Sequence, residues 1–366
     1  MKEAFKPQRY GSASPTHKIK TLFVNGYGEK HFNYRWHFGA CTPDTVPELD
    51  VSFMSTVAMT HHRSLQNILN HMRFIRAILR VGPDYDYLFC HENTYSSRLI
   101  AALKRMGFLR KPKLVLLEFD IDMARGSKVR RYGVESFMRM FYTSADLILA
   151  SSNYQKETYQ ETQMFKNTRI DYVPSSLSDN RVAFLESQAK AAPSAPVAGS
   201  YVFSVGQSNR DFNSLLRAAT DFPKKKFIIM ARQVSEGAPP NVSFVNWGAY
   251  ENYMSYFVNA ELILLPLKGH QHAAGLTTLF EAWAVGKPVI VAATNAIKEF
   301  TEVKEETVLS YQPENAEDLS AKLSYAFTHP TILNAIAKNG HACLHENYTS
   351  SAYLAQLREK LKELEA

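Results

Sequence analysis

Apolar residues in this chain gather in short continuous runs, and segments with helical spacing separate these runs. Such runs, bounded by glycine, proline or polar residues, are typical of parallel strands that are buried on both faces. The pattern predicts helices between the runs, for example at 96–106 and from about Ser152. It predicts strands at 21–26, 87–90, 113–118, 146–150, 201–206, 226–231, 242–245, 261–265 and 288–292. We therefore expect an α/β protein built from βαβ units.

The alternation is interrupted once, at residues 175–199, which are rich in proline, serine and alanine in the manner of a linker. A chain of 366 residues suits two domains. Packing of the last predicted helix, 353–364, back onto the first domain stays open. We expect a disordered lead-in at 1–18, a Rossmann-like N-terminal domain at 19–174, a linker at 175–199 and a Rossmann-like C-terminal domain at 200–366.

The cysteine content and the lengths of the apolar runs indicate the cellular compartment of the protein. Three cysteines, Cys41, Cys90 and Cys343, show no pairing or metal-ligand spacing, which favours a reducing compartment. No run approaches the roughly 18 apolar residues of a membrane span, and the N-terminus lacks the apolar segment of a secretory signal. We therefore expect a cytoplasmic protein.

The net charge of +7 is unevenly distributed, because Lys and Arg outnumber Asp and Glu before residue 174 and the remainder is near neutral. A basic half suggests an anionic partner such as a membrane surface. No aromatic and basic residues interleave as in single-strand nucleic-acid motifs, so no nucleic-acid partner is expected.

The segment 61–81 has no acidic residue and combines apolar residues at helical spacing with arginines along one edge. A helix lying on an anionic membrane and a core-facing helix with a solvated edge both fit this pattern. A peripheral membrane location therefore stays open. The apolar positions are Leu65, Ile68, Leu69, Met72, Ile75 and Leu79, and the basic ones are Arg73, Arg76 and Arg80.

The segment 273–290 carries the clearest chemical signal. Small residues run into a short predicted helix that contains Glu281 and ends at Gly286, before the apolar run that starts at Val289. The N-terminus of a helix binds anions, because unpaired N–H groups and the helix dipole point at the ligand. Glu281 lies further along, where it would accept from sugar hydroxyls. A phosphate beside a hydroxylated ring describes a nucleotide-sugar, although an ordinary helix–strand junction also carries Gly and Pro.

This segment resembles family 4 of the GT-B glycosyltransferases, whose E-A-x-A-x-G-x-P-V-I motif matches 281–290. The resemblance is strong over 200–350 and weak over 20–175. The first acid of the family's E-x7-E pair falls at Ala273 and is missing, which puts the donor-sugar contact in question. The resemblance implies two Rossmann-like domains facing each other across a cleft, with the nucleotide-sugar in the C-terminal domain and the acceptor in the N-terminal domain. It also implies retention of configuration and no metal or other cofactor, the UDP- or GDP-sugar being the donor substrate.

Donor-binding residues are expected on the loops of the C-terminal half. Arg210 lies where the resembled family has a basic residue, and a guanidinium there would grip and stabilise the leaving diphosphate. Alternatively, Arg210 is exposed while Asn209 or Asp211 caps a helix. His270 or His272 would replace the missing acid, or be solvent-exposed; no cysteine or acid completes a metal set with them. The expected donor residues are Gly206, Arg210, Arg232, Lys268, His270, His272, Ala274, Gly275, Leu276, Thr277 and Glu281.

Acceptor-side residues are expected at the ends of the strands in the N-terminal half. Asp120 would orient the acceptor hydroxyl or act as a catalytic general base, although acids at strand ends also cap helices. The other expected acceptor-side residues are Asn25, Gly26, Tyr27, His91, Glu92 and Glu118.

These observations predict a hexosyltransferase-like enzyme that moves a sugar from a nucleotide-diphosphate-sugar to a hydroxyl of a glycan, glycolipid or other acceptor. Two alternatives stay open. A sugar-nucleotide epimerase shares the GT-B plan and would act without an acceptor. A non-catalytic nucleotide-sugar-binding or scaffold protein fits the missing acid at Ala273.

Overall fold

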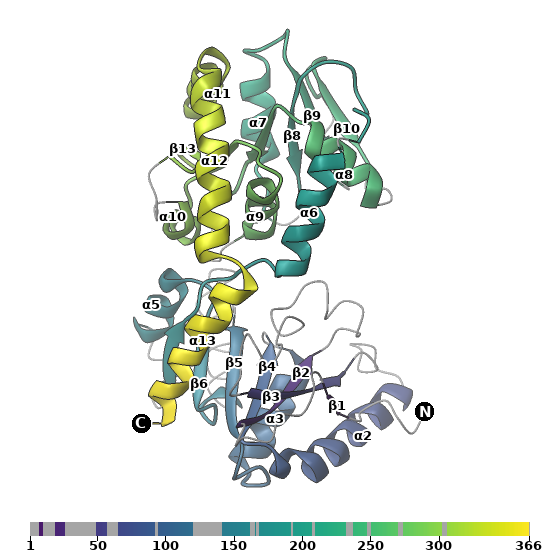
Figure 1. The fold of residues 1–366 in the computed structure, drawn as a ribbon, viewed down its shortest axis with the longest axis vertical. Helices are drawn as coiled ribbons and strands as arrows, with labels where there is room; N and C mark the ends of the chain where they lie inside the picture. Colours follow the sequence, from purple (N-terminus) through teal and green to yellow (C-terminus); the bar gives the residue numbers. More distant parts are fainter. Residues whose placement is uncertain are drawn as a thin grey trace. The chain divides into compact units, whose positions relative to one another are not determined.

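The computed structural model describes residues 7–9, 19–25, 49–56, 65–91, 94–119, 141–161, 165, 168–191, 193–206, 209–231, 237–246, 250–269, 274–301 and 306–365. The chain divides into two compact units, each built on one β-sheet (Figure 1). Unit 1 comprises Met1–Asn180 and Ser350–Ala366, and unit 2 comprises Arg181–Thr349.

The sheet of unit 1 has the strand order β1-β3-β2-β4-β5-β6-β7. Neighbouring strands run parallel, except that the edge strand β1 pairs antiparallel with β3. The strands are β1 (Gln8–Arg9), β2 (Ile19–Asn25), β3 (Leu49–Ser55), β4 (Tyr87–His91), β5 (Lys113–Phe119), β6 (Leu147–Ala150) and β7 (Arg169–Tyr172). The helices are α2 (Leu65–Val81), the short η2 (Gly82–Asp84), α3 (Tyr95–Arg105), α5 (Asn153–Glu161) and α13 (Ser350–Glu365).

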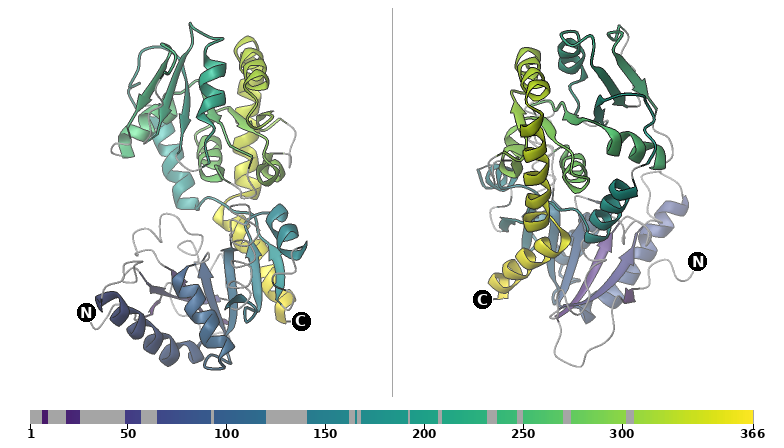
Figure 2. Two further views of the ribbon diagram at one scale, coloured as in Figure 1. Left: turned by 180° about the vertical axis from the view of Figure 1, so that it is seen from behind. Right: turned by 45° about the horizontal axis from the view of Figure 1, so that its top comes forward.

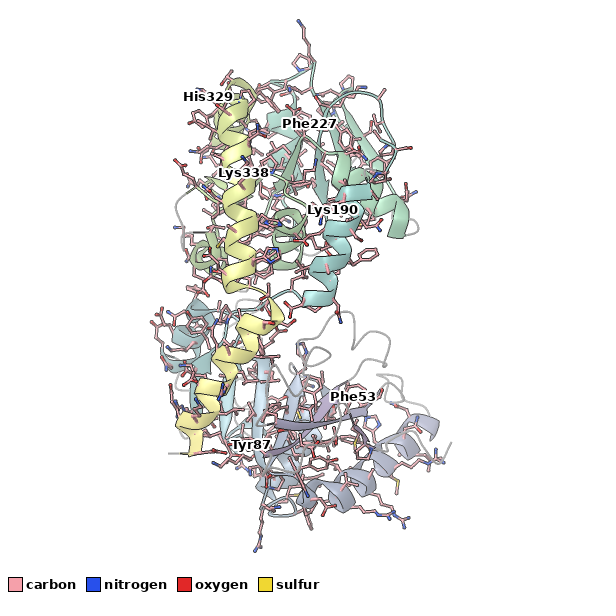
Figure 3. All side chains as sticks on the ribbon, viewed as in Figure 1. Phe53, Tyr87, Lys190, Phe227, His329 and Lys338 are labelled. Atoms are coloured by element: carbon pink, nitrogen blue, oxygen red, sulfur yellow. The ribbon has the colours of Figure 1, made fainter. Side chains whose placement is uncertain are left out.

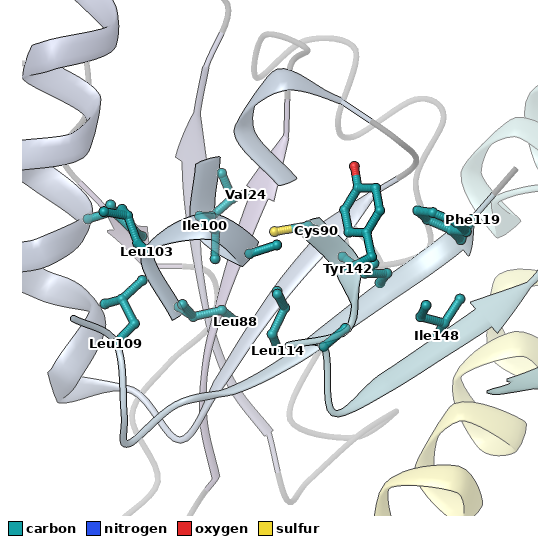
Figure 4. Close-up of a cluster of buried hydrophobic side chains, with 14 of the residues drawn as sticks. Val24, Leu88, Cys90, Ile100, Leu103, Leu109, Leu114, Phe119, Tyr142 and Ile148 are labelled. Carbon is teal, nitrogen blue, oxygen red and sulfur yellow. The ribbon is translucent and has the colours of Figure 1, made fainter. Parts of the chain in front are cut away.

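Successive side chains of a strand point to opposite faces of the sheet. In unit 1, an apolar cluster covers each face, so both faces are buried. Leu22 and Val24 of β2 enter the apolar cluster shown in Figure 4, which includes residues of α2 and α3. Phe23, between them, enters a second cluster, to which α13 contributes Tyr353, Leu354, Leu357 and Leu361. Helix α13 therefore lies on the face opposite to α2 and α3 and completes unit 1, although it follows unit 2 in the sequence (Figures 1 and 2).

The sheet of unit 2 is parallel, with the order β10-β9-β8-β11-β12-β13. Counted from its own first strand, this is the 3-2-1-4-5-6 order of nucleotide-binding Rossmann sheets, and the order reverses between β8 and β11. The strands are β8 (Tyr201–Val205), β9 (Lys226–Met230), β10 (Val242–Val245), β11 (Leu262–Leu265), β12 (Val289–Ala292) and β13 (Leu309–Tyr311). The helices are α6 (Asp179–Ala191), α7 (Phe212–Ala219), α8 (Tyr250–Asn259), α9 (Leu276–Ala284), α10 (Asn295–Thr301), α11 (Ala316–Thr328) and α12 (Pro330–Asn347).

The prediction of two Rossmann-like α/β domains is confirmed. Tyr87 in unit 1 and Phe227 in unit 2 are buried on predicted strands, and Phe53 is buried on β3, a strand that the sequence analysis does not predict (Figure 3). The structure departs from the expected boundaries at two places. Gln8–Arg9, in the expected lead-in, pairs with β3. The segment 175–199, the expected linker, contains the whole of α6, which buries only Val182 and Leu185.

Helix α12 packs closely against α9 at Gly340. A Cβ atom at this position would overlap the indole ring of Trp283, which is fully buried. The indole is also held on another side, because its Nε1 donates to the Thr307 carbonyl oxygen at 3.3 Å. The two helices reach this separation because residue 340 carries no side chain.

We expect Gly340→Ala to destabilise the protein by about 1–3 kcal/mol, the usual result of overpacking a core. The intrinsic preference of alanine for helices would by itself stabilise the variant by about 1 kcal/mol. A net loss in the free energy of unfolding therefore shows that the packing effect is the larger one. Urea unfolding followed by circular dichroism measures this free energy. Gly269→Ala is the control, because its Cβ would meet only the end of Glu314, at 3.6 Å. A Gly340→Ala protein as stable as the wild type would contradict the account.

Candidate functional site

The loops that follow β8 and β11 are joined at the point where the strand order of unit 2 reverses. In open parallel sheets, ligands bind at this point, beyond the carboxyl ends of the strands. Arg210 forms an isolated antiparallel bridge with Leu267. Next to it, the Lys268 N–H donates to the Asn209 carbonyl oxygen, and Asn209 Nδ2 donates to the Lys268 carbonyl oxygen, each at 3.2 Å. The loop after β8 and the loop after β11 are therefore held together by hydrogen bonds at this point.

The side chain of Arg210 is half-buried and lies against Gly206. Its Nε donates to the Val205 carbonyl oxygen at 3.1 Å. Gly206 has φ 131°, and a Cβ there would overlap the guanidinium group, so this position requires glycine. Burial lowers the pKa of Arg210 to about 10, against a smaller opposing effect of Tyr253, and the group stays charged at neutral pH. Asp211 does cap α7 by accepting from the Ser214 N–H, but Arg210 is not the exposed residue of that alternative.

The N-terminus of α9 is shaped by Gly275. This residue caps the helix in the left-handed conformation, with φ 89°, and makes no side-chain cap bond. A Cβ there would also lie only 3.1 Å from Leu267, whose backbone pairs with Arg210. Leu276 and Thr277 open the helix directly after it. The structure thus connects five of the predicted donor residues. Gly206 lies against Arg210, and Arg210 pairs with Leu267. Leu267 in turn lies against Gly275, which Leu276 and Thr277 follow.

Glu281 lies in the interior of unit 2, with 6% of its surface exposed. Its Oε1 accepts from Arg181 Nη2 at 2.5 Å and from Nε at 3.2 Å, and its Oε2 accepts from the Tyr253 hydroxyl. Sequence reasoning missed Arg181, which lies on α6 in the segment expected to be a linker. A buried carboxylate requires a charged partner, but the sequence does not indicate which basic residue, 100 positions away, supplies it.

The remaining predicted donor residues either make no contact with Arg210 that is described above or lie outside the described part of the chain. Lys268 is exposed and Ala274 is half-buried at the start of the turn before α9. Arg232, His270 and His272 lie outside the described residues, as does Ala273.

On the acceptor side, His91 and Glu118 lie together at the carboxyl ends of the adjacent strands β4 and β5. His91 Nε2 and Glu118 Oε2 are 2.7 Å apart. Glu118 has φ 46°, and the pairing of β5 with β6 shifts register between Leu116 and Phe119. A bulge of this kind redirects a side chain, and backbone strain in a non-glycine residue is frequent at functional sites.

The environment of Glu118 also includes α13. Burial, and to a smaller degree the charge of Glu118, raises the pKa of Tyr353 on that helix well above its usual value. Asn25 ends β2, the neighbour of β4 in the sheet. Gly26, Tyr27, Glu92 and Asp120 lie outside the described part of the chain.

Helix α2 has an exposed face that is both apolar and basic. Ile68 and Met72 are 57% and 61% exposed, and Leu69 is also exposed, whereas Phe74 and Ile78 are buried. The apolar positions of the predicted stripe therefore do not all face the core. At 3.6 residues per turn, the exposed apolar residues and the exposed arginines at 73, 76 and 80 share about 140° of the helix circumference. Among the helices that the structure describes, none is long and apolar enough to cross a membrane.

We expect Arg181→Ala to destabilise the protein by about 3–5 kcal/mol, because it leaves the buried Glu281 carboxylate without its charged partner. The same change in a Glu281→Gln background is expected to cost less, because no uncompensated charge remains. Thermal and urea unfolding of the four proteins of this double-mutant cycle measures the coupling. Equal losses in both backgrounds would show that the ion pair does not hold α6 against α9.

Residues 210–359 match the family model described as glycosyl transferase-like. A search of curated proteins found no match to the chain.

Solved structures that cover nearly the whole chain share its fold. Sucrose-phosphate synthase from Thermosynechococcus elongatus matches 95% of this chain and 99% of its own, with 15% identity and a TM-score of 0.68. A glycosyltransferase from Rickettsia africae matches 95% and 99%, with 13% identity and a TM-score of 0.64. HepE of Anabaena, solved with UDP and glucose, matches 94% and 100%, with 14% identity and a TM-score of 0.62. Residues 210–359 thus match a glycosyl transferase-like domain, and the chain as a whole has the two-domain GT-B fold of these solved structures.

Proposed function

We propose that unit 2 binds the diphosphate of a nucleotide-sugar at the junction of the β8 and β11 loops, and that the protein transfers the sugar to an acceptor hydroxyl. The observation that carries this proposal is the connection of Arg210, Leu267 and Gly275. Its support is that the backbone of the loop carrying the half-buried Arg210 pairs with Leu267, which lies against the residue that caps α9, at the switch point of a Rossmann sheet.

The backbone N–H groups of Leu276 and Thr277 and the guanidinium of Arg210 are the proposed diphosphate ligands. Both kinds of donor stabilise the charge that develops on a leaving diphosphate, and neither has to reorganise during the reaction. The positive charge of Arg210 would take the place of a divalent cation, which supports metal-independent transfer. Retention of configuration remains a proposal that rests on the resemblance of the 281–290 motif to family 4.

Glu281 is proposed to contact a hydroxyl of the donor, the ribose being the first candidate. An ionised carboxylate accepts about four hydrogen bonds. Arg181 makes two bonds to Glu281 and Tyr253 makes one, so acceptor capacity remains on the carboxylate. In this proposal, the same network that fixes the carboxylate also orients it for the ligand.

The pair formed by His91 and Glu118 is proposed to bind the acceptor, a glycan, glycolipid or other hydroxyl compound. Its support is the 2.7 Å contact and the strained backbone of Glu118 at the carboxyl end of β5. Asp120 follows two residues later and remains a proposed catalytic residue that orients the acceptor hydroxyl.

Calorimetric titration with UDP, GDP and their sugar derivatives, in the presence of EDTA, tests the donor site. UDP is the first choice, because HepE, which shares the fold, was solved with it. We expect one of these nucleotides to bind without metal, and Arg210→Ala to weaken it about tenfold to hundredfold, as for a lost charged hydrogen bond. Arg217→Ala is the matched control, because this α7 arginine is 70% exposed and pairs with Glu317.

Turnover measurements separate the remaining outcomes. Glu118→Gln is expected to slow sugar transfer while leaving donor affinity unchanged. Unchanged affinity in Arg210→Ala would remove that residue from the site, and failure of every nucleotide to bind would refute the proposed function. Epimerised sugar-nucleotide formed without an acceptor would identify an epimerase, and donor binding without turnover would indicate a binding or scaffold protein.

We also propose that the exposed face of α2 binds anionic membranes. Its apolar residues would enter the boundary between headgroups and acyl chains, and Arg73, Arg76 and Arg80 would contact the lipid phosphates.

Replacing these three arginines by glutamine is expected to weaken binding to phosphatidylglycerol vesicles on the order of 100-fold, at about 1 kcal/mol for each charge. Vesicle co-sedimentation measures this affinity, with phosphatidylcholine vesicles as the neutral control. The charge-matched variant replaces Lys322, Lys338 and Arg358 by glutamine. Equal losses in the two variants would show that overall charge, and not the α2 face, drives binding.

A further inference from the structure

Two histidines of α12 and a glutamate of α6 converge on one point of unit 2. His341 Nε2 lies 3.0 Å from Glu186 Oε1, and His345 Nε2 lies 2.8 Å from the same oxygen. The three ligand atoms all lie within 4.8 Å of one another. Figure 3 shows the two helices that carry these residues, marked by Lys190 on α6 and Lys338 on α12.

The spacing of the histidines suits a chelate. Residues four apart lie on the same face of a helix, and the two imidazole rings have their centroids 4.6 Å apart. Bonds of about 2.0–2.2 Å at tetrahedral angles place the ligand atoms of a zinc ion about 3.3 Å apart. The distances from Glu186 are a few tenths of an ångström shorter, a difference that small side-chain rotations remove.

The charges and the exposure of the cluster also suit a cation. A glutamate carboxylate is negatively charged at neutral pH, and a neutral imidazole offers a nitrogen lone pair, so all three side chains can donate electrons to a cation. The side chains of His341 and His345 are 41% and 42% exposed, and that of Glu186 is 26% exposed. Water therefore has access to complete the coordination of a bound ion.

We propose that Glu186, His341 and His345 form a binding site for a late first-row divalent cation, with Zn²⁺ as the best match. Two imidazole nitrogens and one carboxylate oxygen form a ligand set that Zn²⁺ takes readily, with a water molecule in the fourth position. None of the three residues belongs to the proposed donor or acceptor sites. The inference is thus independent of the proposed function, and it does not conflict with metal-independent sugar transfer.

A cation at this position fastens α6 to α12. On α6, Glu186 follows Arg181 by five residues, about 7.5 Å along the helix axis, and Arg181 pairs with Glu281. On α12, His341 follows Gly340, which packs against Trp283 of α9. The bound ion therefore stabilises the arrangement of the three helices α6, α9 and α12.

Titration of the chelator-treated, full-length protein with Zn²⁺ and with Co²⁺ tests the site. We expect one ion per chain, visible absorption bands of tetrahedral Co²⁺, and a rise in the melting temperature with Zn²⁺. We expect Zn²⁺ to bind more than about 100-fold more weakly to the double variant His341→Ala/His345→Ala, and also to Glu186→Gln. A residue that only hydrogen-bonds a metal ligand, without contacting the ion, would cause a smaller loss. His329→Ala is the matched control, because this exposed histidine at the start of α12 contacts Tyr325 and not the cluster.

Circular dichroism of the metal-free proteins shows whether each variant is folded, and Glu186→Gln supplies a second test if the double variant is not. No saturable binding to the wild type would overturn the site. Zn²⁺ binding that survives in the folded double variant, or that is lost equally in His329→Ala, would place the ion elsewhere and would also overturn it.

Discussion

The buried carboxylate of Glu281 is the constraint on which the arrangement of unit 2 depends. An ionised group inside a protein is tolerated only when charged and hydrogen-bonded partners replace the lost water. Arg181 from α6 and Tyr253 from α8 supply these partners. Helix α9 is therefore fixed by its neighbours at the level of Glu281, in the helix that also provides the proposed phosphate site.

Two packing contacts extend this constraint along α9. At its N-terminus, Gly275 fits against Leu267 in a conformation that glycine adopts without strain. Near its C-terminus, Trp283 fills the space left by the missing side chain of Gly340. With Arg210 held beneath Gly206, the donors proposed for the diphosphate are positioned before any ligand arrives. Such preorganisation lowers the cost of binding and strengthens the stabilisation of a leaving anion.

The sequence predicts the features that are local in the chain. The strand at Tyr201–Val205 and the strand at Val289–Ala292 are continuous apolar runs, and their positions are predicted to within one residue. Helix α6 is not predicted, because alanine and proline dominate the region around it and only Val182 and Leu185 are buried. The short strand β13 and the half-buried strand β7 lack an apolar run of the same kind.

The contacts that define the sites are long-range, and a single sequence does not specify them. The motif at 281–290 singles out Glu281, but not its pairing with Arg181. His91 and Glu118 are each predicted at a strand end, whereas their contact follows from the pairing of β4 with β5. The spacing of His341 and His345 is visible in the sequence, but the third ligand of the proposed cation site lies 155 positions from His341.

Hydrogen exchange followed by mass spectrometry, with and without a saturating nucleotide diphosphate, tests the central claim most directly. The account predicts slower exchange in peptides covering 203–212 and 274–284, because bound phosphates engage the backbone N–H groups at the start of α9 and shield the loop that carries Arg210 from water. Exchange in α2 serves as the internal reference and should not change. Saturating nucleotide that leaves both of these peptides unaffected would contradict the account.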